Sequence, residues 1–190
     1  MVPRSGDAAI LRVRAHAILV EAAERGDGAA ACHLGDLYRE GQGSLARCPD
    51  QARRWYARSA LAGDADGQNN LGACFQHGLG GTQSYRQAVY WYRRAAIAGL
   101  ACAASNLAHC HLRGHGVPKD ETIALHWFEA ALEQAHPHAE EWVARLRASG
   151  IPAAGLKQAE PSLPRHTNPN FWDVTEDVMR HGIAILIGDR

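Results

Sequence analysis

The feature that most constrains this chain is a tryptophan that recurs at a fixed interval. Trp55, Trp91 and Trp127 lie 36 residues apart, and each is followed by a second aromatic residue. A period of this length is typical of structural repeats in which each unit buries the apolar face of its neighbour. Leucines, alanines and glycine pairs recur with the same period to within one residue: Leu34, Leu71 and Leu107; Ala52, Ala88 and Ala124; Gly41/Gly43, Gly78/Gly80 and Gly114/Gly116.

Each unit is predicted to contain two antiparallel helices, because neither helix alone can bury its apolar stripe. The first helix should end at the Gly-x-Gly loop, where glycine accepts a positive φ, and Pro49 suits the start of a second helix. The tandem aromatic residues are predicted to fill the core, while alanines and glycines let the helices approach closely. The first helices are expected at residues 27–40, 64–77 and 100–113, and the second helices at 49–62, 85–98 and 120–134.

The pattern continues in altered form at both ends. An N-terminal stretch matches a lone second helix that would cap the stack, and a stretch after the third unit matches a first helix. Prolines at 152, 161 and 164 then prevent a continuous helix, so a linker is expected there. The expected organisation is a capping helix at 7–25, repeats at 26–62, 63–98 and 99–135, a fourth first helix at 136–150, a linker at 151–168, and a short helix with an apolar tail at 169–190.

Three strings resemble the Sel-1-like repeat, a relative of the tetratricopeptide repeat. They are GDADGQNNLG at 63–72, AVYWYRRAAIAG at 88–99 and GHGVPKD at 114–120, and the resemblance extends over residues 26–135. It implies an all-α fold, a right-handed α-α superhelix, and a role as an adaptor or scaffold in protein complexes, often in bacteria. Some members are extracellular and carry a disulfide in each unit. The cysteines here do not recur at one pair of positions, which disfavours that subclass.

Composition limits the classes of partner and the cellular compartments that are expected for this chain. Twenty basic residues balance twenty acidic ones, so no overall positive field favours a nucleic-acid partner. Arginines and a histidine interrupt the first apolar stretch at 10–20, which predicts neither membrane insertion nor a signal peptide. Five cysteines without Cys-x-x-Cys spacing favour free thiols and a cytoplasmic protein. Residues 2–6 also resemble an expression-vector remnant, so a natural leader stays an open alternative.

The resemblance implies that the first helices line the concave surface of the stack, where a partner would bind. Counted from the residue that opens each unit (Gly26, Gly63, Gly99 and, in the fourth, Ala135), positions 3, 7, 10 and 14 fall within one arc of the helix. We call these positions the first-helix stripe. It consists of Ala29, His33, Asp36 and Glu40; Asp66, Asn70, Ala73 and His77; Cys102, Asn106, His109 and Arg113; His138, Trp142, Arg145 and Ser149.

A protein or peptide partner is predicted to contact the polar and aromatic residues of the stripe. Acidic residues lie toward its N-terminal end and basic residues toward its C-terminal end, which would orient a segment of mixed charge. Trp142 is the expected anchor. Asn70 and Asn106 match an asparagine common in the repeat, so hydrogen bonding to the backbone is an equal alternative for them. The predicted protein-binding residues are His33, Asp36, Glu40, Asp66, Asn70, His77, Asn106, His109, Arg113, Trp142 and Arg145.

Catalytic and metal-binding interpretations are disfavoured. His111 and His115 have the four-residue spacing of a ligand pair, but His115 lies in the loop beyond the helix and no carboxylate completes the set. The glycine-rich turn at 78–81 lacks the Lys-Ser/Thr that follows a phosphate-binding loop. Cys110 and His109 are consecutive, so they point about 100° apart on a helix. We therefore expect no catalytic residue, metal or cofactor.

The sequence leads to a non-enzymatic adaptor or scaffold as the first hypothesis. A second hypothesis is structural: the tail at 171–187 exchanges between copies, giving a homo-oligomer, or inserts into a partner. A role as an immunity protein or chaperone for a secreted toxin is a further alternative, which rests on analogy alone. A histidine-based metal-binding protein or enzyme is the least favoured.

Overall fold

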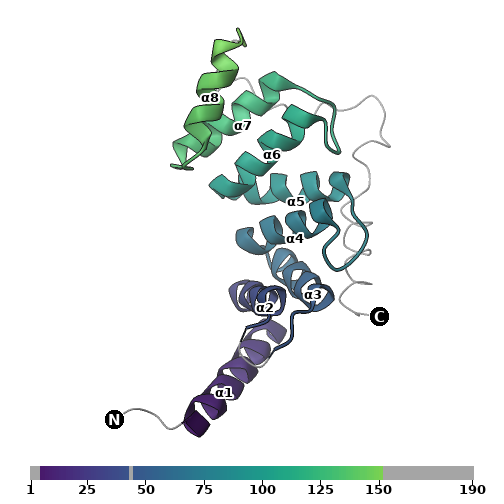
Figure 1. Cartoon of the computed structure of the whole chain (residues 1–190), viewed down its shortest axis with the longest axis vertical. Coiled ribbons are helices and arrows are strands. Elements are labelled where there is room, and N and C mark those ends of the chain that lie inside the picture. Colours follow the sequence, from purple (N-terminus) through teal and green to yellow (C-terminus); the bar gives the residue numbers. More distant parts are fainter. Residues whose placement is uncertain (1–4, 43–44, 152–190) are drawn as a thin grey trace.

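The computed structural model of the chain describes residues 5–42 and 45–151, with side chains from residue 13 onward. This part is all-helical, and its helices stack along the long axis of the molecule, with α1 extending obliquely from one end (Figure 1). The predicted all-α solenoid is therefore confirmed. The helices are α1 (Ser5–Glu24), α2 (Gly28–Glu40), α3 (Pro49–Leu61), α4 (Ala65–His77), α5 (Tyr85–Ile97), α6 (Ala101–Arg113), α7 (Glu121–Glu133) and α8 (Ala139–Ala148).

Side-chain caps explain where several helices begin. Asp27 accepts a hydrogen bond from the Ala30 backbone N–H at 3.0 Å, and Asp64 accepts one from Gly67 at 2.7 Å. Asp120 caps α7 in the same way, through two N–H groups. Each cap satisfies backbone donors that have no partner inside the helix. The repeat therefore sets its own helix starts through short polar residues at recurring positions.

In the Gly-x-Gly loops at 78–80 and 114–116, the two glycines have different roles. The first ends the helix in the left-handed region, with φ of 68° at Gly78 and 72° at Gly114. The second lies against the preceding second helix: a Cβ on Gly80 would be 2.3 Å from the Pro49 carbonyl oxygen, and one on Gly116 would be 2.4 Å from the Tyr85 carbonyl carbon. The loop thus needs its second glycine for close packing between neighbouring units.

The second residue of each aromatic pair forms the core of its unit. Tyr56, Tyr92 and Phe128 are each at most 1% exposed. They pack against a small residue on the first helix, because a Cβ on Gly35 would lie 2.4 Å from the Tyr56 ring and one on Gly72 would lie 2.8 Å from the Tyr92 ring. In the third unit Ala108, fully buried in the same core cluster as Phe128, takes the place of the glycine.

The tryptophans of these pairs also pack in the core, but to different depths. Trp91 is buried, but Trp55 and Trp127 are only half-buried. The tryptophan precedes the core aromatic by one residue and therefore lies about 100° round the helix, at the edge of the interface. The Arg58 guanidinium covers part of the Trp55 ring, with its central carbon 4.9 Å from the ring centroid. The prediction that the tryptophans pack in the core is thus confirmed, with Trp55 and Trp127 at its edge.

The N-terminal helix α1 packs against the rest of the stack through its C-terminal half. Leu19, Val20 and Ala23 contact the core cluster of α2, whereas Val13 and Ile18 are 63% and 66% exposed. Each of the second helices α3, α5 and α7 packs extensively against the first helix before it and the one after it, whereas α1 packs extensively against α2 alone among the described helices. None of the helices within residues 5–42 and 45–151 combines the length and the apolar character that crossing a membrane requires. The predicted linker from residue 152, the helix at 169–182 and the apolar tail lie outside the described residues.

Candidate functional site

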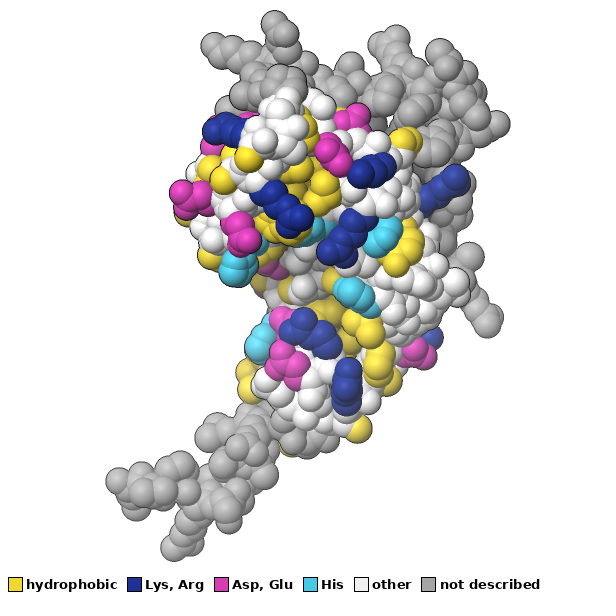
Figure 2. All heavy atoms as spheres, turned by 45° about the horizontal axis from the view of Figure 1, so that its top comes forward, with side chains coloured by type: hydrophobic (Ala, Val, Ile, Leu, Met, Phe, Trp, Pro, Cys, Tyr) yellow, Lys and Arg dark blue, Asp and Glu magenta, His cyan; other side chains and the backbone are white. Residues whose placement is uncertain are grey.

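The first helices α2, α4, α6 and α8 bring the predicted stripe to the surface. None of the predicted binding residues is buried: His33, Glu40, Asp66, His77, Arg113 and Arg145 are exposed, and Asp36, Asn70, Asn106, His109 and Trp142 are half-buried. The structure gathers eight of them into two clusters, one between α2 and α4 and the other between α6 and α8. Figure 2 shows basic, acidic and histidine side chains interspersed over the visible face of the molecule.

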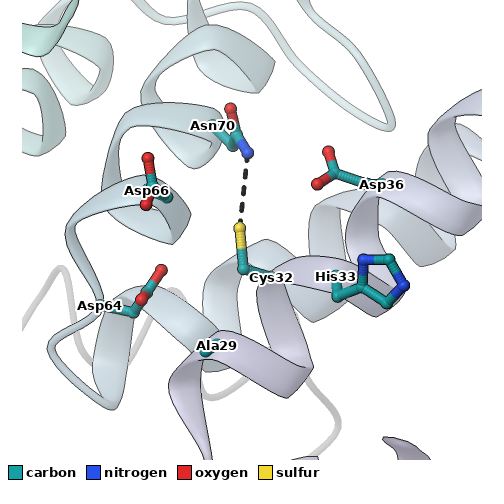
Figure 3. Close-up of a pocket in the computed structure, with 7 residues that line it drawn as sticks. All are labelled: Ala29, Cys32, His33, Asp36, Asp64, Asp66 and Asn70. Atoms are coloured by element: carbon teal, nitrogen blue, oxygen red, sulfur yellow. Dashed lines mark hydrogen bonds between the residues drawn. The ribbon is translucent and has the colours of Figure 1, made fainter.

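The first cluster surrounds a hollow of about 270 Å³ between α2 and α4, which we call the acidic hollow (Figure 3). Its lining combines three carboxylates with an imidazole, an amide and a thiol. Four predicted residues are among them, while Asp64 and Cys32 were not predicted because neither belongs to the stripe. The lining residues are Ala29, Cys32, His33, Asp36, Asp64, Asp66 and Asn70.

The three carboxylates of the acidic hollow differ in how many hydrogen bonds and ion pairs they form within the protein. Asp64 caps α4 and also accepts a hydrogen bond from the Ser59 hydroxyl at 3.0 Å. Asp36 accepts one from the Tyr56 hydroxyl at 2.7 Å and pairs with Arg39 at 3.0 Å. Asp66 is exposed and has no ion pair or hydrogen bond to its side chain among residues 13–42 and 45–151. It is therefore the carboxylate most available to a cation from solution.

Cys32 lies at the floor of the acidic hollow and is chemically quiet. Burial raises the pKa of its thiol to about 12, and the negative charges of Asp36 and Asp64 act in the same direction. The thiol accepts a hydrogen bond from the Asn70 amide at 3.5 Å. A thiol that stays protonated at neutral pH is a poor nucleophile and a poor metal ligand. The hollow is thus suited to binding through its carboxylates.

The stripe asparagines connect neighbouring first helices. Asn106 donates a hydrogen bond to the Asn69 side-chain oxygen at 2.9 Å, just as Asn70 donates to Cys32. In both cases the acceptor is a side chain of the preceding first helix. The predicted alternative named the backbone as the acceptor and is wrong in that respect, because both amides donate to side chains.

The second cluster, which we call the aromatic-basic cluster, consists of His109, Arg113, Phe128, Trp142 and Arg145. Trp142 stacks on Phe128 with ring centroids 5.5 Å apart and an angle of 6° between the planes. His109 contacts both rings edge-on, at 5.0 Å from each. The predicted anchor is thus half-buried, with its indole held in place by two other rings.

Positive charge surrounds these rings. The Arg145 guanidinium carbon lies 5.3 Å from the Trp142 ring centroid, within the range of a cation-π contact. Burial lowers the pKa of His109, and the nearby Arg113 and His136 lower it further. His109 is therefore neutral at neutral pH, and its Nδ1 is buried with no hydrogen-bond partner in the described structure. The cluster takes its charge from Arg113 and Arg145.

The other residues considered from the sequence lie outside both clusters. Glu40 pairs with Arg39 at 2.8 Å, and the His77 ring nitrogen lies 3.3 Å from the Gln76 amide nitrogen. His115 stacks on Tyr85, with ring centroids 4.4 Å apart. All five cysteines are free. Among the residues searched, no group of three or more His, Cys, Asp or Glu side chains is placed to hold a metal ion.

Three stretches of the chain match the model of the Sel1 repeat family, at residues 28–64, 65–100 and 103–136, which together make up more than half of the sequence. The structure is similar to a Sel1 repeat protein from Oxalobacter formigenes, with a TM-score of 0.63 and 30% identity over 66% of this chain and 50% of that one. It is also similar to a protective antigen of uropathogenic Escherichia coli strains that displays an SLR fold (TM-score 0.62, 29% identity, 71% of this chain and 33% of that one).

A third similar structure, cysteine rich protein B of Helicobacter pylori, shares the fold at 20% identity, with a TM-score of 0.52 and coverage of 66% of this chain and 95% of that one. No curated protein matches the sequence. The chain spans half or less of the length of the Oxalobacter and Escherichia proteins. Their repeat arrays or additional parts therefore extend beyond what aligns with this chain.

Proposed function

The chain belongs to the Sel1 repeat family, and we propose that it is a scaffold that binds a segment of another protein along its first-helix stripe. Sel1 repeat proteins are generally protein-interaction modules and are typically non-enzymatic. In this proposal the stripe faces the concave side of the solenoid, and a partner segment lies across α2, α4, α6 and α8. Extended surfaces of this kind are how solenoid proteins commonly bind their partners.

The acidic hollow is the observation that carries the proposal. Its volume of about 270 Å³ is just below the roughly 300–1,000 Å³ of small-molecule sites. It opens between two first helices, and Asp66, whose carboxylate has no partner among the described residues, lies across it from half-buried Asp36 (Figure 3). A single lysine or arginine side chain from a partner would fill such a hollow and meet opposite charge. The hollow thus supports recognition of a protein side chain better than binding of a metabolite.

The compartment and the alternatives follow from less direct arguments. Five free thiols fit a reducing environment, so we place the interaction in the cytoplasm of a bacterium. Oligomerisation through residues 171–187 would depend on a segment outside the described residues. A role against a secreted toxin would depend on analogy. Both stay predictions, and neither is favoured by a contact in the structure.

Affinity capture with matched variants tests the proposal. Wild-type protein, Asp66→Lys and the control Arg54→Glu would be used to capture proteins from a native bacterial lysate. Arg54 is exposed on α3, a second helix, and lies outside the stripe. We expect a protein to be retained by wild type and by Arg54→Glu and to be lost with Asp66→Lys. Equal retention by all three proteins, loss with Arg54→Glu, or no retained protein would contradict the proposal.

A further inference from the structure

The aromatic-basic cluster contains both arginines of the first-helix stripe, Arg113 and Arg145. Arg25, Arg39, Lys119 and Arg147 each pair with a carboxylate, and the Arg147–Glu129 pair on α8 has a distance of 2.8 Å. Arg113 and Arg145 are exposed and have no ion pair within residues 13–42 and 45–151. Two cations without an ion pair therefore lie near the same group of rings, Arg145 over Trp142 and Arg113 close enough to His109 to lower its pKa.

Acidic residues are also missing from the adjacent stripe positions. On α6 these positions hold Cys102, Asn106, His109 and Arg113, and on α8 they hold His138, Trp142, Arg145 and Ser149. The carboxylates of α8 belong to Glu140 and Glu141 in its first turn, outside the stripe. No carboxylate of the stripe itself thus neutralises this end of the surface.

The rings hold the charge in a defined position. Trp142 is fixed by stacking on Phe128, which is fully buried, and by the edge-on contact with His109. The Arg145 guanidinium lies over this indole, 5.3 Å from its ring centroid. A side chain that is already restrained loses less conformational entropy when a partner binds. Tryptophan and arginine are also the residues that most often dominate binding energy at protein interfaces.

We infer that the C-terminal end of the first-helix stripe binds an acidic segment of the partner protein, with its carboxylates against Arg113 and Arg145 and its chain beside Trp142. The inference rests on the proposed function and names the chemistry of the partner. Charge complementarity selects this occupant. A long polyanion such as a nucleic acid would run on toward Asp66 and Asp36 and be repelled there, whereas a protein segment can change charge along its length.

Binding of short peptides of known charge tests the inference. Three pools of 12-residue peptides with the same aromatic content would carry four acidic residues, no charged residues or four basic residues. Affinities would be measured by fluorescence anisotropy at low and at physiological salt. The variant is Arg113→Glu with Arg145→Glu. Its control, Arg14→Glu with Arg54→Glu, makes the same change in net charge at exposed residues of α1 and α3. Circular dichroism would confirm that both variants are folded.

We expect the acidic pool to bind about tenfold more tightly than the neutral pool, with a preference that weakens as salt rises. The double reversal on α6 and α8 should remove this preference, and the control should keep it. Equal affinity for the acidic and neutral pools, or an equal loss in the control, would overturn the inference. So would tighter binding of an oligonucleotide of equal charge, or self-association of the wild type that the reversal abolishes.

The two proposals fail in distinguishable ways. If Asp66→Lys loses a captured protein but the acidic pool shows no advantage, stripe binding stands and the acidic partner segment is wrong. If no protein is captured in a stripe-dependent manner and none of the three pools binds, both proposals are wrong.

Discussion

The acidic hollow and the aromatic-basic cluster occupy equivalent places in the repeat but have opposite shapes. At position 7 the hollow has Asn70 where the cluster has Trp142, and at position 10 it has Asp36 where the cluster has His109. The small polar side chains leave about 270 Å³ open, whereas the rings fill the same kind of space by stacking on Phe128. The backbone of the repeat thus provides the place, and two side chains per unit decide whether it is open or filled.

The contrast extends to the core aromatic beneath each site. In the first unit the Tyr56 hydroxyl donates to Asp36, so the core residue holds one wall of the hollow. In the third unit Phe128 has no hydroxyl and meets the edge of the His109 ring. In each case the core aromatic therefore suits the residue above it: a tyrosine hydroxyl donates to a carboxylate, and a phenylalanine ring packs against an imidazole ring. This match suggests that a site could be converted only by changing both residues together.

The largest expected loss of stability comes from removing the Phe128 ring, on which Trp142 of the aromatic-basic cluster stacks. Phe128→Ala should lower the free energy of unfolding by about 3–5 kcal/mol, because Phe128 is fully buried and the cavity cannot close completely. Tyr56→Phe, which removes only one hydrogen bond at the open site, should cost about 1 kcal/mol. Urea denaturation of both variants would measure the difference. If the two variants lose a similar amount of unfolding free energy, the core aromatic contributes equally to stability at the two sites, contrary to the prediction.

Substitution of the glycine beneath the acidic hollow should destabilise the protein more than substitution of the alanine beneath the aromatic-basic cluster. Gly35→Ala should destabilise by about 1–3 kcal/mol through overpacking, since its Cβ would lie 2.4 Å from the Tyr56 ring. The reverse change in the third unit, Ala108→Gly, should cost only about 1 kcal/mol because it mainly adds flexibility to α6. Thermal denaturation would rank the two. A neutral Gly35→Ala would mean that Tyr56 has room to move.

The residue that opens the last unit offers a stabilising change. Ala135 has a φ of 58°, in the left-handed region, where Gly26, Gly63 and Gly99 stand in the other units with φ between 91° and 95°. Ala135→Gly should relieve strain and raise the free energy of unfolding by about 1 kcal/mol. Hydrogen exchange of α8 should slow accordingly. Faster exchange in α8 would contradict this interpretation.

Lowering the pH should reduce the stability of the C-terminal half of the described structure more than that of the N-terminal half. Burial is the main reason that the pKa values of His109, His111 and His136 are lowered. A lowered pKa in the folded state means that their contribution to stability is complete above the unfolded value of about 6.5 and is lost as pH falls through the folded value. Hydrogen exchange at pH 7 and pH 5 should show the loss in α6 to α8.

A replacement within the same half provides the control for this pH effect. His111→Phe restores the aromatic residue that Phe75 supplies at the equivalent position of the second unit. It should make the stability of α6 depend less on pH. An unchanged dependence would assign the effect to groups other than His111.

The sequence predicts the helices and the stripe because both depend on periodicity. It does not predict the acidic hollow, because that requires Asp64, a helix cap, and Cys32, a neighbour of the stripe, to meet between α2 and α4. Nor does it predict Arg53, which is 4% exposed at a position where the other units have Val89 and Leu125. Arg53 lies over the Phe75 ring at 4.1 Å and donates to the Thr82 carbonyl oxygen at 3.3 Å, which offsets part of the cost of its burial, while its Nε is buried with no hydrogen-bond partner in the described structure.

Site-specific photo-crosslinking from Cys102 tests the central claim most directly. Cys102 is an exposed residue of the stripe, whereas burial raises the pKa of Cys32 to about 12 and those of Cys74 and Cys110 to about 11. In a Cys48→Ser background, a benzophenone maleimide would therefore label Cys102. The matched control carries Cys102→Ser with Arg54→Cys. If the partner binds the stripe, it will crosslink from position 102 and not from position 54; crosslinking from position 54 alone, or equally from both, would contradict the account.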